Sequence, residues 1–185
     1  MSLHHRLTLP TVTLFVALLG PLAVARAQEA PAPCLDGGAY DQFDFWVGEW
    51  DVFTPDGVRA GSNRIEKVAA GCLLVEHWTS AAGGTGNSLN YYHPARQQWI
   101  QVWVDGQGGV IEVAGEFTDG AMRFVGEHVY PDGRREAFRM RFTPQVDGSV
   151  RQFIEQSKDE GATWYVWFDG RYERTGRPDT GEPRE

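Results

Sequence analysis

Apolar and polar residues alternate in short runs along most of the chain, and turn residues separate the runs. We expect ten of these runs to form β-strands, because a period of two places alternate side chains on opposite faces of a strand. They cover residues 48–54, 58–68, 71–79, 87–92, 98–105, 109–117, 121–129, 134–143, 149–157 and 163–173. Before the first strand, residues 41–47 (DQFDFWV) are rich in aromatic rings, and we expect a short helix or turn that packs as a plug.

The links between these segments favour antiparallel hairpins. A parallel crossover needs a dozen or more residues, and the links are shorter than that. Dipeptides such as Asp119-Gly120 and Asp147-Gly148 supply the positive φ angles of tight hairpin turns. Strands joined in this way close into an up-and-down barrel, which leaves no exposed strand edge. The pattern therefore predicts an all-β protein with a single antiparallel up-and-down barrel of about ten strands.

The hairpin register predicts which side chains point into the barrel. In the last strand, four apolar residues share one face and set the inward direction, namely Trp164, Val166, Phe168 and Tyr172, whereas Tyr165 and Trp167 point outward unless a bulge intervenes. Propagating this register gives an aromatic interior that also holds Glu76, Gln101, Asp105, His128, Gln152 and Gln156. Ten strands enclose more space than eight, so inward polar groups favour a hydrated ligand cavity. The alternative is that they pair with one another or lie at the barrel mouths, the favoured interpretation for Asp105 and His128.

The first 27 residues have the pattern of a secretory signal peptide. A polar, basic start at His4-His5-Arg6 is followed by an apolar stretch, and Ala25-Arg26-Ala27 is a small-x-small cleavage pattern. No second hydrophobic stretch follows, so we expect an exported, soluble protein without membrane insertion, periplasmic or extracellular. The predicted organisation is a signal peptide at 1–27, a flexible leader at 28–40, the barrel domain at 41–174 and a disordered tail at 175–185.

Export changes the interpretation of the two cysteines, Cys34 and Cys72. An oxidising compartment favours a disulfide between them, which would tie the N-terminal segment to the strand that begins near Cys72. The alternative is two independent buried thiols. Neither cysteine has a histidine or cationic neighbour in sequence that would favour catalysis.

Composition and charge exclude several classes of protein. The 185 residues are 42% hydrophobic and 23% charged, which excludes intrinsic disorder and coiled-coil chains. The formal net charge of -8 becomes -10 after cleavage, because Arg6 and Arg26 are removed with no acidic residue. Nucleic acid and anionic membranes need a basic surface, so neither is an expected partner.

One stretch carries a resemblance to a known family. Residues 43–52 (FDFWVGEWDV) resemble the opening signature of a family of bacterial secreted proteins of unknown function that are similar to lipocalins and other calycins. Ser88–Tyr92, followed by Trp99, Gln101 and Trp103, looks like the central block of this family. The resemblance implies a calycin-type barrel but no reaction, so no catalytic residue is carried over. The glycine-rich signature of haem-binding nitrobindin relatives is not seen.

The sequence favours a module that binds a small apolar or aromatic molecule. Aromatic rings offer large contact areas and lose little rotamer entropy on binding. The expected ligand-binding residues are Glu76, Trp78, Trp99, Gln101, Trp103, Phe124, Gln152, Trp164 and Phe168. The alternative is that these rings only fill the barrel.

A second hypothesis is a cofactor-independent isomerase, lyase or hydrolase. Glu76 in an apolar wall is the best candidate for a general acid or base, with Asp105 or His128 as its partner. The alternative, which the sequence supports equally, is that Glu76 is a structural carboxylate bonded to Asn90 or Arg64. Whether the protein is an enzyme stays open at this stage.

Metal sites and assembly are further hypotheses. His77, His93 and His128 have no partner at ligand spacing, so neither a metal nor another cofactor is expected. Ile100, Val102 and Val104 fall on the predicted outer face, and an outward apolar patch commonly marks a partner surface. A homodimer is therefore a further hypothesis.

Overall fold

The computed structural model describes Cys34 and residues 37–175. The predicted signal peptide at 1–27, most of the predicted leader and the predicted tail beyond Thr175 lie outside this part of the chain. Within it, no helical segment combines the length and the apolar character of a membrane-crossing helix.

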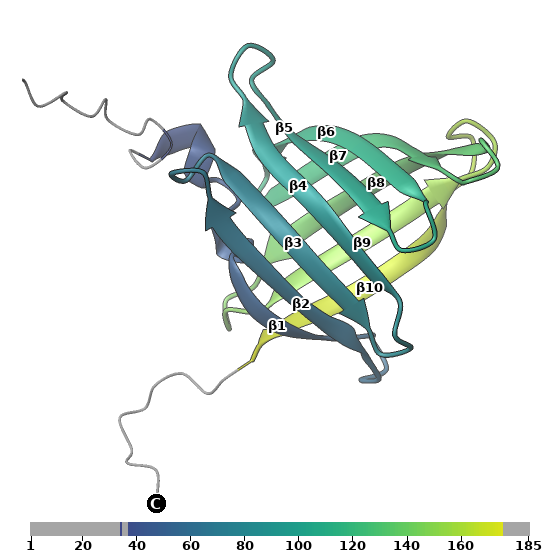
Figure 1. Cartoon of the computed structure of the whole chain (residues 1–185), viewed down its shortest axis with the longest axis horizontal. Coiled ribbons are helices and arrows are strands. Elements are labelled where there is room, and N and C mark those ends of the chain that lie inside the picture. Colours follow the sequence, from purple (N-terminus) through teal and green to yellow (C-terminus); the bar gives the residue numbers. More distant parts are fainter. Residues whose placement is uncertain (1–33, 35–36, 176–185) are drawn as a thin grey trace, which may run out of the picture. The chain divides into compact units, whose positions relative to one another are not determined.

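Ten antiparallel strands form a closed barrel in which each strand pairs with its neighbours in sequence, and β1 pairs with β10 (Figure 1). The strands are β1 (Gly48–Phe53), β2 (Arg59–Val68), β3 (Leu73–Ser80), β4 (Thr85–His93), β5 (Gln98–Asp105), β6 (Val110–Thr118), β7 (Ala121–Val129), β8 (Arg135–Pro144), β9 (Val150–Ser157) and β10 (Tyr165–Arg174). The prediction of an all-β up-and-down barrel is confirmed, and the architecture is consistent with a lipocalin-like fold.

The turn chemistry determines where the hairpins reverse. Asp119 and Gly120 have φ angles of 48° and 73°, and they join Thr118 directly to its partner Ala121. Two successive positive φ angles match the right-handed twist of the flanking strands, which is why this dipeptide makes the tightest link in the barrel. The aspartate accepts αL geometry through its short polar side chain, and the glycine has no Cβ to clash.

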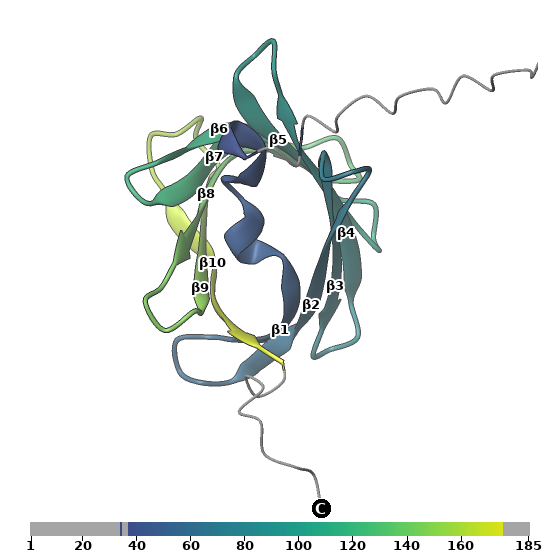
Figure 2. The ribbon, with the colours of Figure 1, turned by 90° about the vertical axis from the view of Figure 1, so that its left-hand side faces the viewer.

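The N-terminal segment enters the barrel and closes one end of the lumen. We call residues 37–47 the plug; they contain two short 3₁₀ turns, η1 (Gly38–Asp41) and η2 (Asp44–Trp46). Figure 2 shows the plug in dark blue inside the ring of strands. Phe43 and Trp46 are fully buried and stack at 4.9 Å, and Trp46 lies 4.7 Å from the ring of Phe142. The predicted aromatic plug is therefore present, and η1 begins at Gly38, before the predicted domain start at residue 41.

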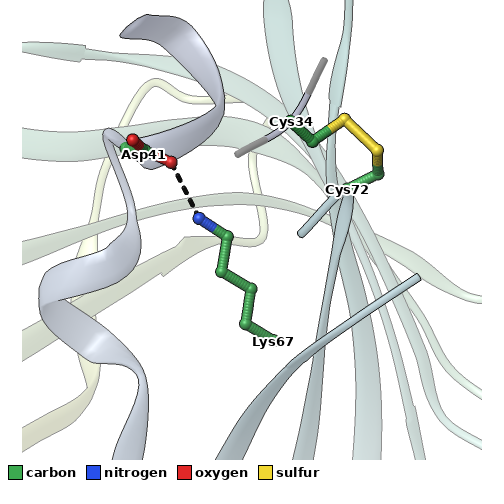
Figure 3. The surroundings of a disulfide bond; sticks show 4 residues. All are labelled: Cys34, Asp41, Lys67 and Cys72. Carbon is green, nitrogen blue, oxygen red and sulfur yellow. Dashed lines mark hydrogen bonds and ion pairs between the residues drawn. A yellow bond between two sulfur atoms is a disulfide. The ribbon is translucent and has the colours of Figure 1, made fainter. Parts of the chain in front are cut away.

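Several contacts fasten the plug to the strands. Cys34 and Cys72 form a disulfide, as predicted, which ties the chain before the plug to the start of β3 (Figure 3). Lys67 Nζ on β2 lies 2.8 Å from Asp41 Oδ1 (Figure 3). It also lies 2.6 Å from Asp44 Oδ2. From β5, Trp99 Nε1 donates a hydrogen bond of 3.1 Å to the carbonyl of Ala39. The lumen end is therefore closed by covalent, ionic and hydrogen-bonded links to three strands.

The inward residues form three layers along the barrel axis, because successive inward positions lie two residues apart on each strand. The plug layer holds apolar residues, among them Ile65, Leu74, Trp99, Phe124 and Phe142. The next layer is polar and contains Asn63, Glu76, Ser88, Asn90, Gln101, Gln152 and Tyr172; we call it the polar belt. The layer beyond the belt again holds large rings, including Trp78, Trp103, Phe138 and Phe168.

A bulge in β10 overturns part of the predicted register. The pairing with β9 shifts between Val166 and Phe168, so the residues before the shift have the opposite orientation to that predicted. Trp164 is wrong as an inward residue: the guanidinium of Arg139, an outer-face residue of β8, lies 4.1 Å from its ring. Val166 is 56% exposed, and Trp167, predicted to point outward, turns toward the lumen. Beyond the bulge, Phe168 and Tyr172 point inward as predicted.

The outer face carries paired charges. Arg139 binds both carboxylate oxygens of Glu155 at 2.8 and 3.0 Å, and Arg151 binds those of Asp169 at 2.8 and 2.7 Å. These residues belong to the outward charge ladder that the register predicts. Opposite charges on neighbouring strands support the register that the apolar interior also requires.

We predict that the disulfide contributes most of the stability of the plug. Replacing Cys34 and Cys72 together by alanine releases a loop constraint spanning 38 residues, which should lower the free energy of unfolding by about 4 kcal/mol. Urea unfolding of the double variant and of the reduced wild-type protein measures this, and the two should agree. A loss below about 1 kcal/mol would show that the remaining contacts hold the plug by themselves.

Candidate functional site

A cavity of about 130 Å³ occupies the lumen on the side of the polar belt that faces away from the plug. Its lining residues come from six strands and are Glu76, Trp78, Gln101, Trp103, Ile111, Phe138, Met140, Gln152, Ile154, Trp167, Phe168 and Tyr172. Because the polar belt supplies the floor and apolar rings supply much of the wall, the cavity can hold a molecule that is polar at one end and apolar elsewhere.

Six of the nine predicted ligand-binding residues line this cavity: Glu76, Trp78, Gln101, Trp103, Gln152 and Phe168. Trp99 and Phe124 point inward as predicted, but both pack against Phe43 in the plug layer, at ring distances of 5.6 and 5.8 Å. Trp164 lies outside the barrel because of the bulge. The alternation of residues along a strand identifies which side chains face inward. It does not show how far the plug extends along the barrel axis.

Trp167 is the main cavity residue that sequence reasoning missed. Its ring lies 5.8 Å from both His128 and Phe138, at the open end of the cavity. The run Trp164–Phe168 is apolar at every position, so alternation gives no signal for the bulge that turns this ring inward. The remaining lining residues, such as Phe138 and Ile154, are on the predicted inward face but were not singled out.

Two tryptophan rings lie flat against the wall because glycines on the neighbouring strands leave room for them. A Cβ added to Gly86 on β4 would overlap the ring of Trp103, and one added to Gly61 on β2 would lie 2.7 Å from Trp78 Cη2. Aromatic rings often cover a strand glycine in this way. With the rings held against the backbone, the centre of the lumen stays open.

The polar belt is one continuous chain of hydrogen bonds. Ser88 Oγ donates to Glu76 Oε2 at 2.5 Å, and Asn63 Nδ2 donates to Glu76 Oε1 at 2.7 Å. On one side, Gln101 Nε2 donates to Asn90 Oδ1, and Asn90 Nδ2 donates to Ser88 Oγ. On the other side, Asn63 Nδ2 lies 3.4 Å from the hydroxyl of Tyr172, which donates to Gln152 Oε1 at 2.7 Å.

Glu76 is the one acidic member of this belt. It is 4% exposed, and its hydrogen-bond donors are neutral. Burial raises the pKa of Glu76 to about 7, although the bonds from Ser88 and Asn63 favour the charged form. Arg64, one of the partners suggested by the sequence, pairs with Glu66 instead, and Asn90 reaches Glu76 only through the Ser88 hydroxyl. The carboxyl group therefore changes charge close to neutral pH.

A second polar group lies at the open end of the cavity, and we call it the mouth cluster. It consists of His128, Tyr130, Arg134, Glu136, Gln156 and Tyr165. The Tyr165 hydroxyl lies 2.7 Å from both Glu136 Oε2 and Gln156 Oε1, and Arg134 pairs with Glu136. His128 Nδ1 lies 2.6 Å from Gln156 Nε2, and burial lowers the pKa of this histidine. The predicted mutual pairing of inward polar groups thus holds for His128 and Gln156.

The structure does not bring Asp105 or His128 into hydrogen-bond contact with Glu76. Asp105 Oδ1 instead accepts bonds from the backbone N–H groups of Gln107 and Gly109, which fixes the turn between β5 and β6. Within residues 37–175 and Cys34, no group of three or more His, Cys, Asp or Glu side chains is arranged to hold a metal ion.

The comparisons with known proteins give no further assignment: no protein-family model matches the chain, and no curated protein is similar to it in sequence.

We predict that Gly86 keeps the cavity open. In Gly86→Ala, the new methyl group displaces the Trp103 ring from the wall, and such overpacking costs about 1–3 kcal/mol of unfolding free energy. Gly84→Ala, where the added Cβ meets only Ser80 Oγ at 3.2 Å, is the matched control. Urea unfolding and the tryptophan emission spectrum of both variants test this. Equal stabilities and identical spectra would argue against the wall arrangement.

We also predict that Glu76 makes stability depend on pH. The folded-state pKa of about 7 lies above the ordinary 4.5, so folding favours the protonated form. Compared with Glu76→Gln, the wild type should lose about 3 kcal/mol of unfolding free energy as pH rises from 4.5 to 7.5, and little more above that. Chemical unfolding of both proteins across this range gives the difference. A constant difference would mean that Glu76 keeps an ordinary pKa.

Proposed function

We propose that this barrel binds a small, largely apolar or aromatic molecule in the cavity between the polar belt and the mouth cluster. The observation that carries the proposal is the open space in the lumen. The wall rings of Trp78 and Trp103 rest on glycines instead of filling that space. Unfilled volume in a protein interior lowers stability, so a cavity that is kept open favours a role in binding.

The size of the cavity limits the ligand. A volume of about 130 Å³ is close to that of an engineered apolar cavity of roughly 150 Å³ that takes up benzene. The preferred guest is therefore a molecule with one ring, or an aliphatic group of similar size. Trp78, Trp103 and Phe168 contact its apolar body, and Glu76, Gln101 and Gln152 at the floor orient its polar end.

Tryptophan fluorescence with single-ring compounds tests this proposal. Toluene and benzyl alcohol should change the emission of the wild-type protein with a saturable dependence on concentration. Trp103→Leu removes a wall ring and should weaken binding by about tenfold, the equivalent of about 1.4 kcal/mol. Trp164→Leu, on the outer face, is the control and should bind like the wild type. Absence of any saturable change, or equal effects of the two variants, would contradict binding in this cavity.

The enzymatic alternative rests on Glu76 alone. A carboxyl group with a pKa of about 7 in an apolar cavity is suited to proton transfer at neutral pH. No second titratable group with hydrogen-bond contact to Glu76 accompanies it in the described part of the chain, so the binding role is the better supported one. If a turnover is found, Glu76→Gln should abolish it, and an unchanged rate would exclude Glu76 as the acid or base.

We further propose that the protein is exported, that it belongs to the secreted lipocalin-like family, and that it forms a homodimer. The disulfide supports an oxidising environment, and residues 43–52 carry the family resemblance. For a dimer, the support is the outer face of β4 and β5, where Leu89 pairs with Val102 and where Leu89 and Val104 are 49% and 47% exposed. Light scattering of the purified protein distinguishes dimer from monomer.

A further inference from the structure

The floor of the cavity holds a carboxylate that has no positive partner among the residues that the structure describes. Glu76 Oε1 and Oε2 each accept one hydrogen bond, from Asn63 and Ser88, and a carboxylate has about four acceptor positions. The neighbouring Asn63 Oδ1 is buried and has no donor within the described residues. No Lys, Arg or His is among the cavity-lining residues of the described structure. The floor is therefore rich in acceptors and negative when Glu76 is ionised.

The cavity walls are also suited to positive charge. Trp78, Trp103, Trp167 and Phe168 surround the space above the floor. The face of an aromatic ring carries partial negative charge and attracts cations, most strongly for tryptophan, and cages of such rings bind ammonium groups in proteins. Rings and carboxylate thus favour the same type of guest.

We propose that the cavity selects small organic monocations, in which an ammonium group contacts Glu76 and an apolar body lies between the aromatic walls. This inference rests on the proposed binding function and names its ligand class. An ammonium group donates up to three hydrogen bonds, to the free acceptor positions of Glu76, and supplies the counter-charge that the described residues lack. A neutral guest of the same shape leaves the buried carboxylate without a partner, which is costly.

The groups around Glu76 make its ionisation the controlling step in cation binding. Of the residues that face it, β2 contributes Asn63, β4 contributes Ser88 and β10 contributes Tyr172. Tyr172 is the titratable one, and burial together with the Glu76 charge raises its pKa well above the usual value, so it stays neutral. The titratable neighbours Arg64, Glu66 and His77 contact one another and lie partly exposed on the outer face. Cation binding should therefore follow the charge of Glu76.

Three probes of nearly equal shape separate charge from size: benzylamine, benzyl alcohol and toluene. Titration of the wild-type protein at pH 8 should show benzylamine binding about tenfold or more tightly than benzyl alcohol. In Glu76→Gln this preference should fall to about twofold or less, whereas toluene binding should not weaken. Glu112→Gln removes the same charge from the outer face of β6 and should keep the wild-type preference.

The pH dependence of wild-type binding tests the same inference without a substitution. Benzylamine stays protonated at pH 8 and below, so its affinity should follow the ionised fraction of Glu76 and fall roughly fiftyfold from pH 7 to pH 5. Benzyl alcohol affinity should change less than threefold over this range. This profile decides the matter if Glu76→Gln does not fold.

The outcomes distinguish the two proposals. If toluene and benzyl alcohol bind as tightly as benzylamine at pH 8, with no fall at low pH, the cation preference is wrong but the binding cavity stands. If none of the three probes binds at any pH, the proposed function fails as well. If Glu112→Gln loses the preference as completely as Glu76→Gln, the overall charge of the protein is responsible and Glu76 is not the recognition group.

Discussion

Ten strands enclose a lumen that is wider than the one their own side chains fill, and the rest of the structure responds to this constraint. At one end the chain fills the space with its own N-terminal segment, where Phe43 and Trp46 are fully buried. The disulfide and Lys67 hold that segment in place (Figure 3). At the other end no segment of residues 37–175 enters the lumen in the same way, and the cavity remains. The plug therefore fills one half of the wide lumen, and the cavity is the half that stays unfilled.

The polar belt separates these halves and explains how polar side chains are tolerated in the middle of the lumen. A buried polar group without a partner costs about 1–3 kcal/mol, so the belt is stable only as a connected chain. Each amide from Gln101 to Gln152 donates to or accepts from the next member. Glu76 is also hydrogen-bonded, but when it is ionised no positive group in the belt balances its charge. A structural network thereby leaves a reactive or recognition group at the cavity floor.

Much of this architecture follows from the sequence because its signals are local. Asp-Gly turns and strict alternation, as in Phe138, Met140 and Phe142, determine hairpins and inward faces one strand at a time. The structure reverses the predicted orientations of Trp164 and Trp167. The residues around them are all apolar, so no alternation of apolar and polar positions reveals the bulge. Trp99 and Phe124 point inward like Trp103, but they lie at the depth that the plug occupies. They therefore pack against Phe43 and do not line the cavity. The bonds of Asn63 and Ser88 to Glu76 depend on pairing across three strands, which parity alone does not specify.

Xenon binding in crystals shows directly whether one half of the lumen is open, because xenon enters apolar cavities that are empty of side chains. We predict one xenon site between Trp103, Phe138 and Ile154, on the side of the belt away from the plug, and none beside Phe43 or Trp46. Electron density showing the wall rings collapsed into that space, or xenon lodged within the plug layer instead, would contradict the division of the lumen into a filled half and an open one.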